Sequence, residues 1–241
     1  MRGRVRHSGF SLTEVLLAVG TLAIGMIFVG GTFLTGVYFS MLSTERTIAA
    51  LVADEAFAKI RLYGIDPSDS RLTAESLVPF ETLNPIDVNE FAYPSTKTVS
   101  KKQYFWSALC RPVSSDSTNR LVQVTVFVCR RVGSMATYPP NGTSRPIPVQ
   151  LDISASGLGN QEQIAITTSG GQAYVTDGCT IVDNRTGLLY RVMQRTPDTP
   201  NIIRLDKTWY GQMTDSVWVV PPPVGGGKNP CIAVYQKLIS F

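Results

Sequence analysis

The segment Gly9-Phe10-Ser11-Leu12-Thr13-Glu14-Val15-Leu16 joins an arginine-rich N-terminus to a long apolar stretch. Residues 1–8 contain three arginines and a histidine, whereas no Asp, Glu, Lys, Arg or His occurs between Glu14 and Glu45. Glu14 is therefore a lone acid at the start of a segment apolar enough to enter a bilayer. A charged carboxylate inside hydrocarbon costs at least about 2.5 kcal/mol. We expect Glu14 to need a neutralising partner.

Cleavage of the chain after Gly9 would create such a partner. The cut leaves a new α-amino group on Phe10, and residues 10 and 14 share one face of a helix because they are four positions apart. The amine could then neutralise the carboxylate, within the same chain or in a neighbouring subunit.

The residues from Gly9 to Leu16 resemble the prepilin cleavage and methylation motif of type IV pilins and type II secretion pseudopilins. The resemblance implies that a prepilin peptidase removes the basic leader, residues 1–9, and that the new N-terminal Phe10 is methylated. It also implies that Glu14 guides subunit docking during fibre assembly. The implied partners are this peptidase and methyltransferase, other pilin or pseudopilin subunits, and an inner-membrane assembly platform. The resemblance covers roughly the first 50 to 60 residues, as far as helical periodicity continues.

An ordinary signal anchor or secretory signal peptide would show similar arginines and a similar apolar core. Two details favour the prepilin interpretation. Glu14 interrupts the beginning of the apolar core, and no small-x-small cleavage site follows an apolar region of about 7–15 residues, the length that signal peptides use.

Residues 10–39 are predicted to form the transmembrane half of an N-terminal helix. The 25 positions from 15 to 39 carry no charge, which is enough to cross roughly 30 Å of hydrocarbon at about 1.5 Å per residue. Arginines that flank an apolar span stay on the cytoplasmic side. The sequence thus predicts a single-pass protein of the cytoplasmic (inner) membrane with an exported head, which later joins a periplasmic or cell-surface fibre.

Residues 40–66 are predicted to continue this helix as an amphipathic segment. The chain has no proline before Pro67, and Gly64 and Pro67 mark the expected end of the helix. Apolar residues recur at three- and four-residue steps and require a cover, which the protein's own head domain would provide. This stripe comprises Leu42, Ala49, Val52, Ala56, Ile60 and Tyr63.

Five glycines interrupt the apolar half of the helix, and two interpretations stay open. Glycine is tolerated in membrane helices, where small residues also permit close helix approach. Alternatively, the glycines allow local stretching when the helix moves from bilayer to fibre. They are Gly20, Gly25, Gly30, Gly31 and Gly36.

The sequence after residue 66 predicts a loop-rich connection at 67–102, with a short helix near 72–77. It also predicts a β-rich exported head at 103–241. Residues 121–128 alternate strongly and are expected to pair with 104–109. Hairpins are predicted for 163–168 with 172–176 and for 180–183 with 188–194, with further strands at 202–205, 217–220 and 232–238. The fold class is therefore α+β, with a long N-terminal α-helix followed by an antiparallel β-meander, similar to pilins.

Four cysteines lie in the predicted exported part, where an oxidising compartment would permit two disulfides in any of three pairings. Cys129 belongs to the strand face opposite the valines, and Cys110 lies at the far end of the predicted hairpin, so a bond between them is not obvious. The pairing of Cys179 with Cys231 is preferred, and free buried thiols remain the alternative. No Cys-x-x-Cys spacing occurs, which removes the usual redox and zinc-ribbon signals.

Charge and histidine content argue against nucleic-acid binding and catalysis. Loss of the leader arginines from 22 basic residues leaves 19 against 18 acidic ones, so the formal charge falls from +4 to near +1 and no nucleic-acid partner is predicted. The only histidine, His7, is in the leader, so the mature chain lacks a Ser-His or Cys-His pair. No cofactor, metal site or enzymatic activity is predicted. The carboxylates considered are turn or surface groups: Asp177, Asp183, Asp152 and Glu162.

The predicted function is that of a minor pilin or pseudopilin, an assembly subunit of a type IV pilus-like fibre or a type II secretion pseudopilus. A head and connection of 175 residues is large for a main fibre subunit. One alternative is a permanently anchored, exported binding or adhesion domain, in which Trp209, Tyr210 and Trp218 could form a contact patch, although such aromatics are more often core. A membrane-tethered hydrolase that uses carboxylates is the second alternative.

Overall fold

The computed structural model describes residue 9 and residues 11–95, 102–114, 120–133, 135–155, 158, 161–196 and 198–241. Predictions for residues 1–8, for Phe10, for part of the connection at 96–101 and for the turn at 115–119 lie outside the described residues. The chain divides into two compact units, Met1–Glu45 and Arg46–Phe241. The predicted α+β class is confirmed, because a 52-residue N-terminal helix precedes antiparallel β-structure.

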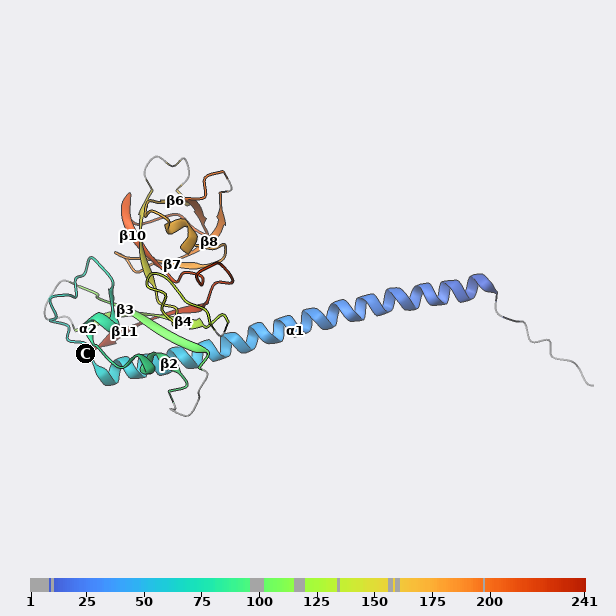
Figure 1. Ribbon diagram of the computed structural model, residues 1–241, viewed down its shortest axis with the longest axis horizontal. Coiled ribbons are helices and arrows are strands. Elements are labelled where there is room, and N and C mark those ends of the chain that lie inside the picture. Colours follow the sequence, from blue (N-terminus) through green and yellow to red (C-terminus); the bar gives the residue numbers. More distant parts are fainter. Residues whose placement is uncertain are drawn as a thin grey trace, which may run out of the picture. The chain divides into compact units, whose positions relative to one another are not determined.

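The long helix, α1, extends over Leu12–Tyr63 and closely matches the predicted helix (Figure 1). At its start, the Ser11 hydroxyl accepts a hydrogen bond from the backbone N–H of Glu14 at 3.2 Å. At its end, Gly64 adopts a φ of 77° and its N–H donates to the Ile60 carbonyl at 3.0 Å. This left-handed residue is the usual way for a helix to end at glycine. The Asn84 side chain caps the same end by donating to the carbonyls of Tyr63 and Gly64.

The second unit contains the C-terminal part of α1, short helical turns and eleven strands among the described residues. The short helices are α2 (Phe80–Leu83), η1 (Val88–Phe91) and η2 (Gly171–Tyr174). The strands are β1 (Val78–Pro79), β2 (Ala92–Tyr93), β3 (Tyr104–Pro112), β4 (Leu121–Arg130), β5 (Val149–Ser154), β6 (Gln163–Ile166), β7 (Thr180–Asp183), β8 (Leu189–Arg195), β9 (Ile202–Leu205), β10 (Thr214–Val219) and β11 (Cys231–Ser240). The predicted helix near 72–77 is wrong, because this stretch forms turns and an isolated bridge between Thr73 and Ser76.

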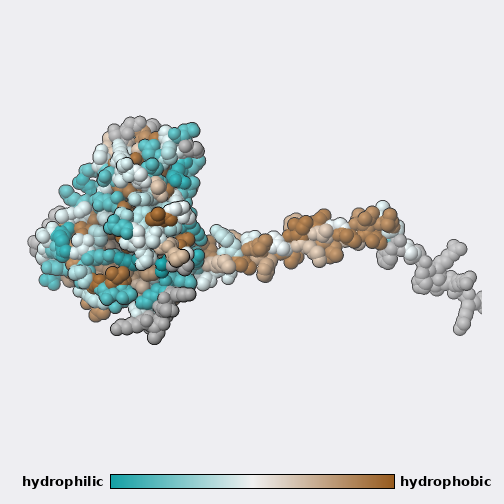
Figure 2. Space-filling model, viewed as in Figure 1, coloured by the Kyte–Doolittle hydropathy of each residue, from teal (hydrophilic) through white to brown (hydrophobic). Residues whose placement is uncertain are grey.

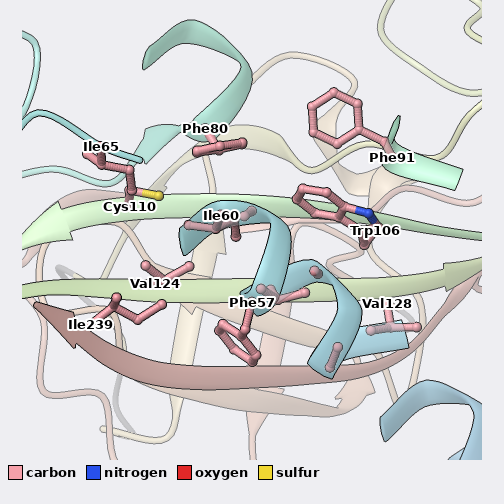
Figure 3. Close-up of a cluster of buried hydrophobic side chains, with 14 of the residues drawn as sticks. Phe57, Ile60, Ile65, Phe80, Phe91, Trp106, Cys110, Val124, Val128 and Ile239 are labelled. Carbon is pink, nitrogen blue, oxygen red and sulfur yellow. The ribbon is translucent and has the colours of Figure 1, made fainter. Parts of the chain in front are cut away.

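The first β-structure is an antiparallel sheet in the order β1-β3-β4-β11, with β2 also paired to β3. The predicted pairing of 104–109 with 121–128 is confirmed, with Ala108 opposite Val126. One face of this sheet packs against α1, and Figure 3 shows Phe57 and Ile60 of α1 beside Val124 and Val128 of β4. The sheet thus covers the predicted amphipathic stripe from Ala49 to Ile60, whereas Tyr63 at the end of the stripe is 40% exposed. The buried residues of α1 are Ala49, Val52, Ala53, Ala56, Phe57 and Ile60.

The second β-structure is a closed antiparallel barrel in the order β10-β5-β6-β9-β8-β7 (Figure 1). The predicted hairpin of 180–183 with 188–194 is confirmed as β7 and β8. The barrel has its own core, which includes Leu151, Ile164, Ile181, Tyr190 and Val217. A third apolar cluster joins the sheet and the barrel through Leu109, Phe127 and Cys129 of the sheet and Val182, Trp218 and Val220 of the barrel region.

The predicted hairpin around Ser169-Gly170-Gly171 is wrong. The chain turns at Gly170, whose φ is 73°, into the 3-10 helix η2, and no strand forms over 172–176. Gly171 is buried, and a Cβ there would lie only 3.0 Å from Ile166 and 3.2 Å from Leu151. Packing of Gly171 against the barrel core replaces the local strand pairing, while Gly170 and Gln172 on either side of it stay exposed. β6 pairs instead with β5 and with β9, which comes much later in the chain.

The strand order is also less local than in a simple meander. β11 pairs with β4 about a hundred residues earlier, and β10 pairs with both β5 and β7. These pairings close the barrel and complete the sheet, so most strands satisfy their backbone groups with partners distant in sequence.

Candidate functional site

The first turn of α1 contains the predicted processing and assembly residues. Gly9 and Glu14 are exposed, and Phe10 lies outside the described residues. Glu14 is the acid of the first helical turn, three residues after Ser11. The Ser11 hydroxyl also lies 2.9 Å from the Thr13 hydroxyl. Ser11-x-x-Glu14 therefore has the spacing of a capping box, in which an acid near a helix N-terminus is also favoured by the helix dipole.

Ser11 is a residue that the sequence analysis missed, although its signal was present. A serine three residues before an acid, directly ahead of an apolar run, is a recognised helix start. Glu14 accordingly has a structural interpretation beside the assembly role. The two can be separated, because glutamine preserves a capping box and removes the charge.

The apolar half of α1 is exposed along its length in the described chain. Figure 2 shows hydrophobic residues, in brown, along this part of the helix. Among the described residues, α1 is the one helix long and apolar enough to cross a membrane, and its apolar window is 0% buried. A signal sequence near an N-terminus would have the same properties. The apolar half of α1 is therefore either a membrane span or a signal sequence.

The threonine hydroxyls inside this apolar segment are satisfied by the helix itself. Thr21 donates to the Ala18 carbonyl, Thr32 to that of Val29 and Thr35 to that of Gly31, each at 2.9 Å. A hydroxyl bonded in this way adds little cost in a bilayer, where unsatisfied polar groups cost several kcal/mol. The Glu14 carboxylate differs, because it has no side-chain partner among the described residues.

Two shallow hollows lie on the same segment, and α1 alone lines them. Their walls include Ala18, Leu22, Gly25 and Val29. A hollow on one face of a single helix is too open to enclose a small molecule. Small residues in such a hollow do let another helix approach closely. Gly25 is the glycine that lines one of these hollows, and a Cβ added there would meet no atom within 4 Å.

All four cysteines are free thiols in the structure. The structure therefore shows neither of the two disulfides that were considered, and it corresponds to the alternative of free thiols. Cys110 packs on the α1 side of the sheet and Cys129 on the opposite side, so the packing does not favour a bond between these two. Cys179 belongs to the barrel core, whereas Cys231 packs beside Cys129, so the packing does not favour the preferred pairing of Cys179 with Cys231.

The carboxylates considered for hydrolysis have local structural partners. Asp177 pairs with Arg195 at 3.5 Å, and Glu162 pairs with Arg204 at 3.0 Å. Asp183 is buried, and its carboxylate accepts hydrogen bonds from the Arg185 N–H at 3.1 Å and from the Thr186 hydroxyl. Burial raises the pKa of Asp183, and the hydrogen bond from Thr186 partly opposes this. Asp152 is exposed on β5.

The described part of the chain contains no cluster of three or more His, Cys, Asp or Glu side chains with the geometry to hold a metal ion.

Asn184 begins the turn between the predicted strands 180–183 and 188–194, and its role was not predicted. It is buried, and its side-chain oxygen accepts hydrogen bonds from Trp218 Nε1 at 2.7 Å and from the Leu77 N–H at 3.1 Å. Asn184 thus links the loop-rich connection at 67–102 to the barrel through hydrogen bonds to Leu77 and Trp218. Trp218 and Trp209 are buried, which confirms that these tryptophans are core, whereas Tyr210 is exposed. No local pattern distinguishes Asn184 from an ordinary turn asparagine.

We predict that Asn184→Ala lowers the free energy of unfolding by about 1–3 kcal/mol, because it leaves the buried Trp218 Nε1–H without its acceptor. Chemical unfolding of the full chain in detergent, followed by circular dichroism, measures the change. Asn201→Ala, at an exposed turn position, is the matched control and should change stability by less than about 0.5 kcal/mol. Equal effects of both substitutions would contradict the role given to Asn184.

The long apolar N-terminal helix followed by antiparallel β-structure is a pilin-like architecture. No family model matches the chain, and comparisons with curated proteins and with solved structures found no match. The class of protein is consequently supported by the N-terminal motif and by this architecture alone.

Proposed function

We propose that the protein is a minor pilin or pseudopilin, a structural subunit of a type IV pilus-like fibre or a type II secretion pseudopilus. The observation that carries the proposal is the combination in α1 of two different halves. One half is apolar and exposed, with Glu14 as its single acid, and the other is packed into a folded domain. A helix of this kind can hold a subunit in a membrane and later in a helical fibre.

The polar groups of the apolar half support an assembly role. The threonine hydroxyls are bonded to the helix backbone, which leaves the Glu14 carboxylate as the group that needs a partner in hydrocarbon. An amine on Phe10, created by cleavage after Gly9, has the opposite charge and the right spacing. In a fibre, that amine can belong to a neighbouring subunit, so the charge pair would align one subunit with the next.

The same proposal specifies the partners of the protein and its location in the cell. A prepilin peptidase and methyltransferase would process the chain at the cytoplasmic membrane, and an inner-membrane platform would add it to other pilin or pseudopilin subunits. The head would then lie in the periplasm or at the cell surface. We infer no catalytic activity for it, because its role is to assemble.

We predict that the protein extracted from membranes of cells with an active prepilin peptidase begins at N-methylated Phe10. Amino-terminal sequencing and intact mass measure this directly. The matched control is Gly9→Val, which should leave the leader in place, because a bulky residue would stand where the motif has glycine.

A wild-type chain that retains Met1 under these conditions would exclude the proposal. It would favour the alternative of a permanently anchored, exported binding or adhesion domain. Release of a soluble protein cut beyond residue 20 would instead identify the apolar segment as a signal peptide.

A further inference from the structure

Cys129 and Cys231 lie directly opposite each other on the neighbouring antiparallel strands β4 and β11. At the next position, the Arg130 N–H donates to the Pro230 carbonyl at 2.8 Å. Hydrogen-bonded and non-hydrogen-bonded pairs alternate along an antiparallel ladder, so Cys129 and Cys231 occupy a non-hydrogen-bonded pair. Cα atoms in such a pair are about 4.5 Å apart, inside the range of roughly 4.4–6.8 Å that a disulfide spans.

Both side chains lie on the same face of the sheet. Cys129 is fully buried beside Leu109 and Phe127, and Cys231 is half-buried against the same cluster. Burial raises the pKa of the Cys129 thiol, and its interaction with the Cys231 thiol raises it further. The register and the shared apolar cluster thus place the two side chains beside each other.

The other two cysteines are less suitable partners for Cys231. Cys110 faces α1 from the opposite side of the sheet and stands opposite Val124 in the register. Cys179 precedes β7 and packs into the barrel core. It is still close enough for Cys231 to contribute to its raised pKa, so a bond between Cys179 and Cys231 is the competing outcome.

We propose that Cys129 and Cys231 are a redox pair that closes into a disulfide when the protein meets an oxidising disulfide, such as that of an exported thiol oxidoreductase. The half-buried Cys231 sulfur, as thiolate, attacks the oxidant and releases one thiolate from it. The Cys129 thiolate then attacks Cys231 in this mixed disulfide and releases the second. The cysteines lose two protons and two electrons, and the oxidant's disulfide becomes a dithiol.

The bond would anchor β11, the last strand of the sheet. β11 pairs only with β4 among the described strands, and it follows the turn at Gly225, Gly226 and Gly227, all of which have positive φ. The register also shifts between Cys231 and Ala233. A covalent link at the start of β11 would hold its pairing beyond this irregularity.

The test uses the full chain in detergent with oxidised glutathione as the probe. After free thiols are alkylated, trypsin places the four cysteines in four separate peptides, because it cleaves after Arg120, Arg130 and Lys228. Arg111 and Arg145 precede proline and resist cleavage. The cysteine peptides are 103–120, 121–130, 132–185 and 229–237. We expect 121–130 linked to 229–237 as the main product and a higher melting temperature of the oxidised protein, which dithiothreitol reverses.

Two variants sharpen the assignment. Cys231→Ser should abolish the product, and Cys110→Ser, at another buried cysteine, should retain it. The tryptic peptide map of the oxidised wild-type protein does not depend on the folding of a variant. This map alone therefore decides which cysteines pair. A main product that links 132–185 to 229–237, or the absence of any link to 229–237, would overturn the proposal. The experiment requires no fibre, so its result is independent of the proposed function.

Discussion

Glu14→Gln is expected to leave leader removal largely intact and to reduce incorporation into fibres more than tenfold. Glutamine has nearly the size of glutamate and can still act in the capping box, but it cannot neutralise an ammonium group. The unpaired charge would cost at least about 2.5 kcal/mol in hydrocarbon, and about 1.4 kcal/mol already corresponds to a tenfold change. Co-purification with assembled fibres, normalised to processed protein in the membrane, measures the effect.

Ser11→Ala is the matched control for this experiment. It removes the hydroxyl that accepts from the Glu14 N–H but preserves the carboxylate. Loss of such a cap costs about 1 kcal/mol of helix stability at one end, so incorporation should fall much less than in Glu14→Gln. The reverse order, with normal assembly of Glu14→Gln and failure of Ser11→Ala, would show that Glu14 serves to start the helix. Glu14→Ala removes both contributions and should assemble no better than Glu14→Gln.

Trp106→Ala is expected to lower the free energy of unfolding of the second unit by about 3–5 kcal/mol. The Trp106 ring is 1% exposed and lies 4.8 Å from the Phe91 ring and 6.2 Å from the Phe80 ring, measured between centroids. Its Nε1–H donates to the Glu90 carbonyl at 3.0 Å. Removal of the ring would leave a cavity between the sheet and the elements that cover it.

The same site also connects the covering elements to α1. Lys59 of α1 donates to the Glu90 carbonyl at 2.7 Å and pairs with the Glu90 carboxylate at 3.0 Å. Trp106→Phe keeps most of the apolar contact and loses the hydrogen bond, so an intermediate loss is expected. Tyr210→Ala, at a side chain that is 70% exposed, is the control and should have little effect. Urea unfolding followed by circular dichroism compares them, and a loss below about 1 kcal/mol for Trp106→Ala would contradict the packing described.

The bounds of α1 were predictable because their causes are local. Helix formation depends on residues within four positions, and the chain from Ser11 to Gly64 combines a cap, an unbroken run without proline and a glycine stop. The two hairpins that were confirmed, β3 with β4 and β7 with β8, also join strands that follow each other in the chain. The failed hairpin at 163–176 had an equally good local signal, but burial of Gly171 in the barrel outweighed it.

The candidate residues divide in the same way. Gly9, Phe10 and Glu14 were recognised from their order in the chain, and they stay predictions until the N-terminus of the processed protein and fibre incorporation are measured. The neighbours of Cys231 and the acceptor of Trp218 could not be predicted, since each is brought close by strands or turns that lie far apart in the sequence.

The sequence by itself determined the lone acid, the apolar segment, the length of α1 and the α+β class, because charge, hydropathy and helical periodicity are properties of neighbouring residues. Only the tertiary structure decided that the β-rich part divides into an open sheet and a closed barrel, and that Cys129 stands opposite Cys231. A strand can pair with any exposed edge of suitable length. The pairing that is adopted is the one that buries the most apolar surface and satisfies the most backbone groups in the whole domain.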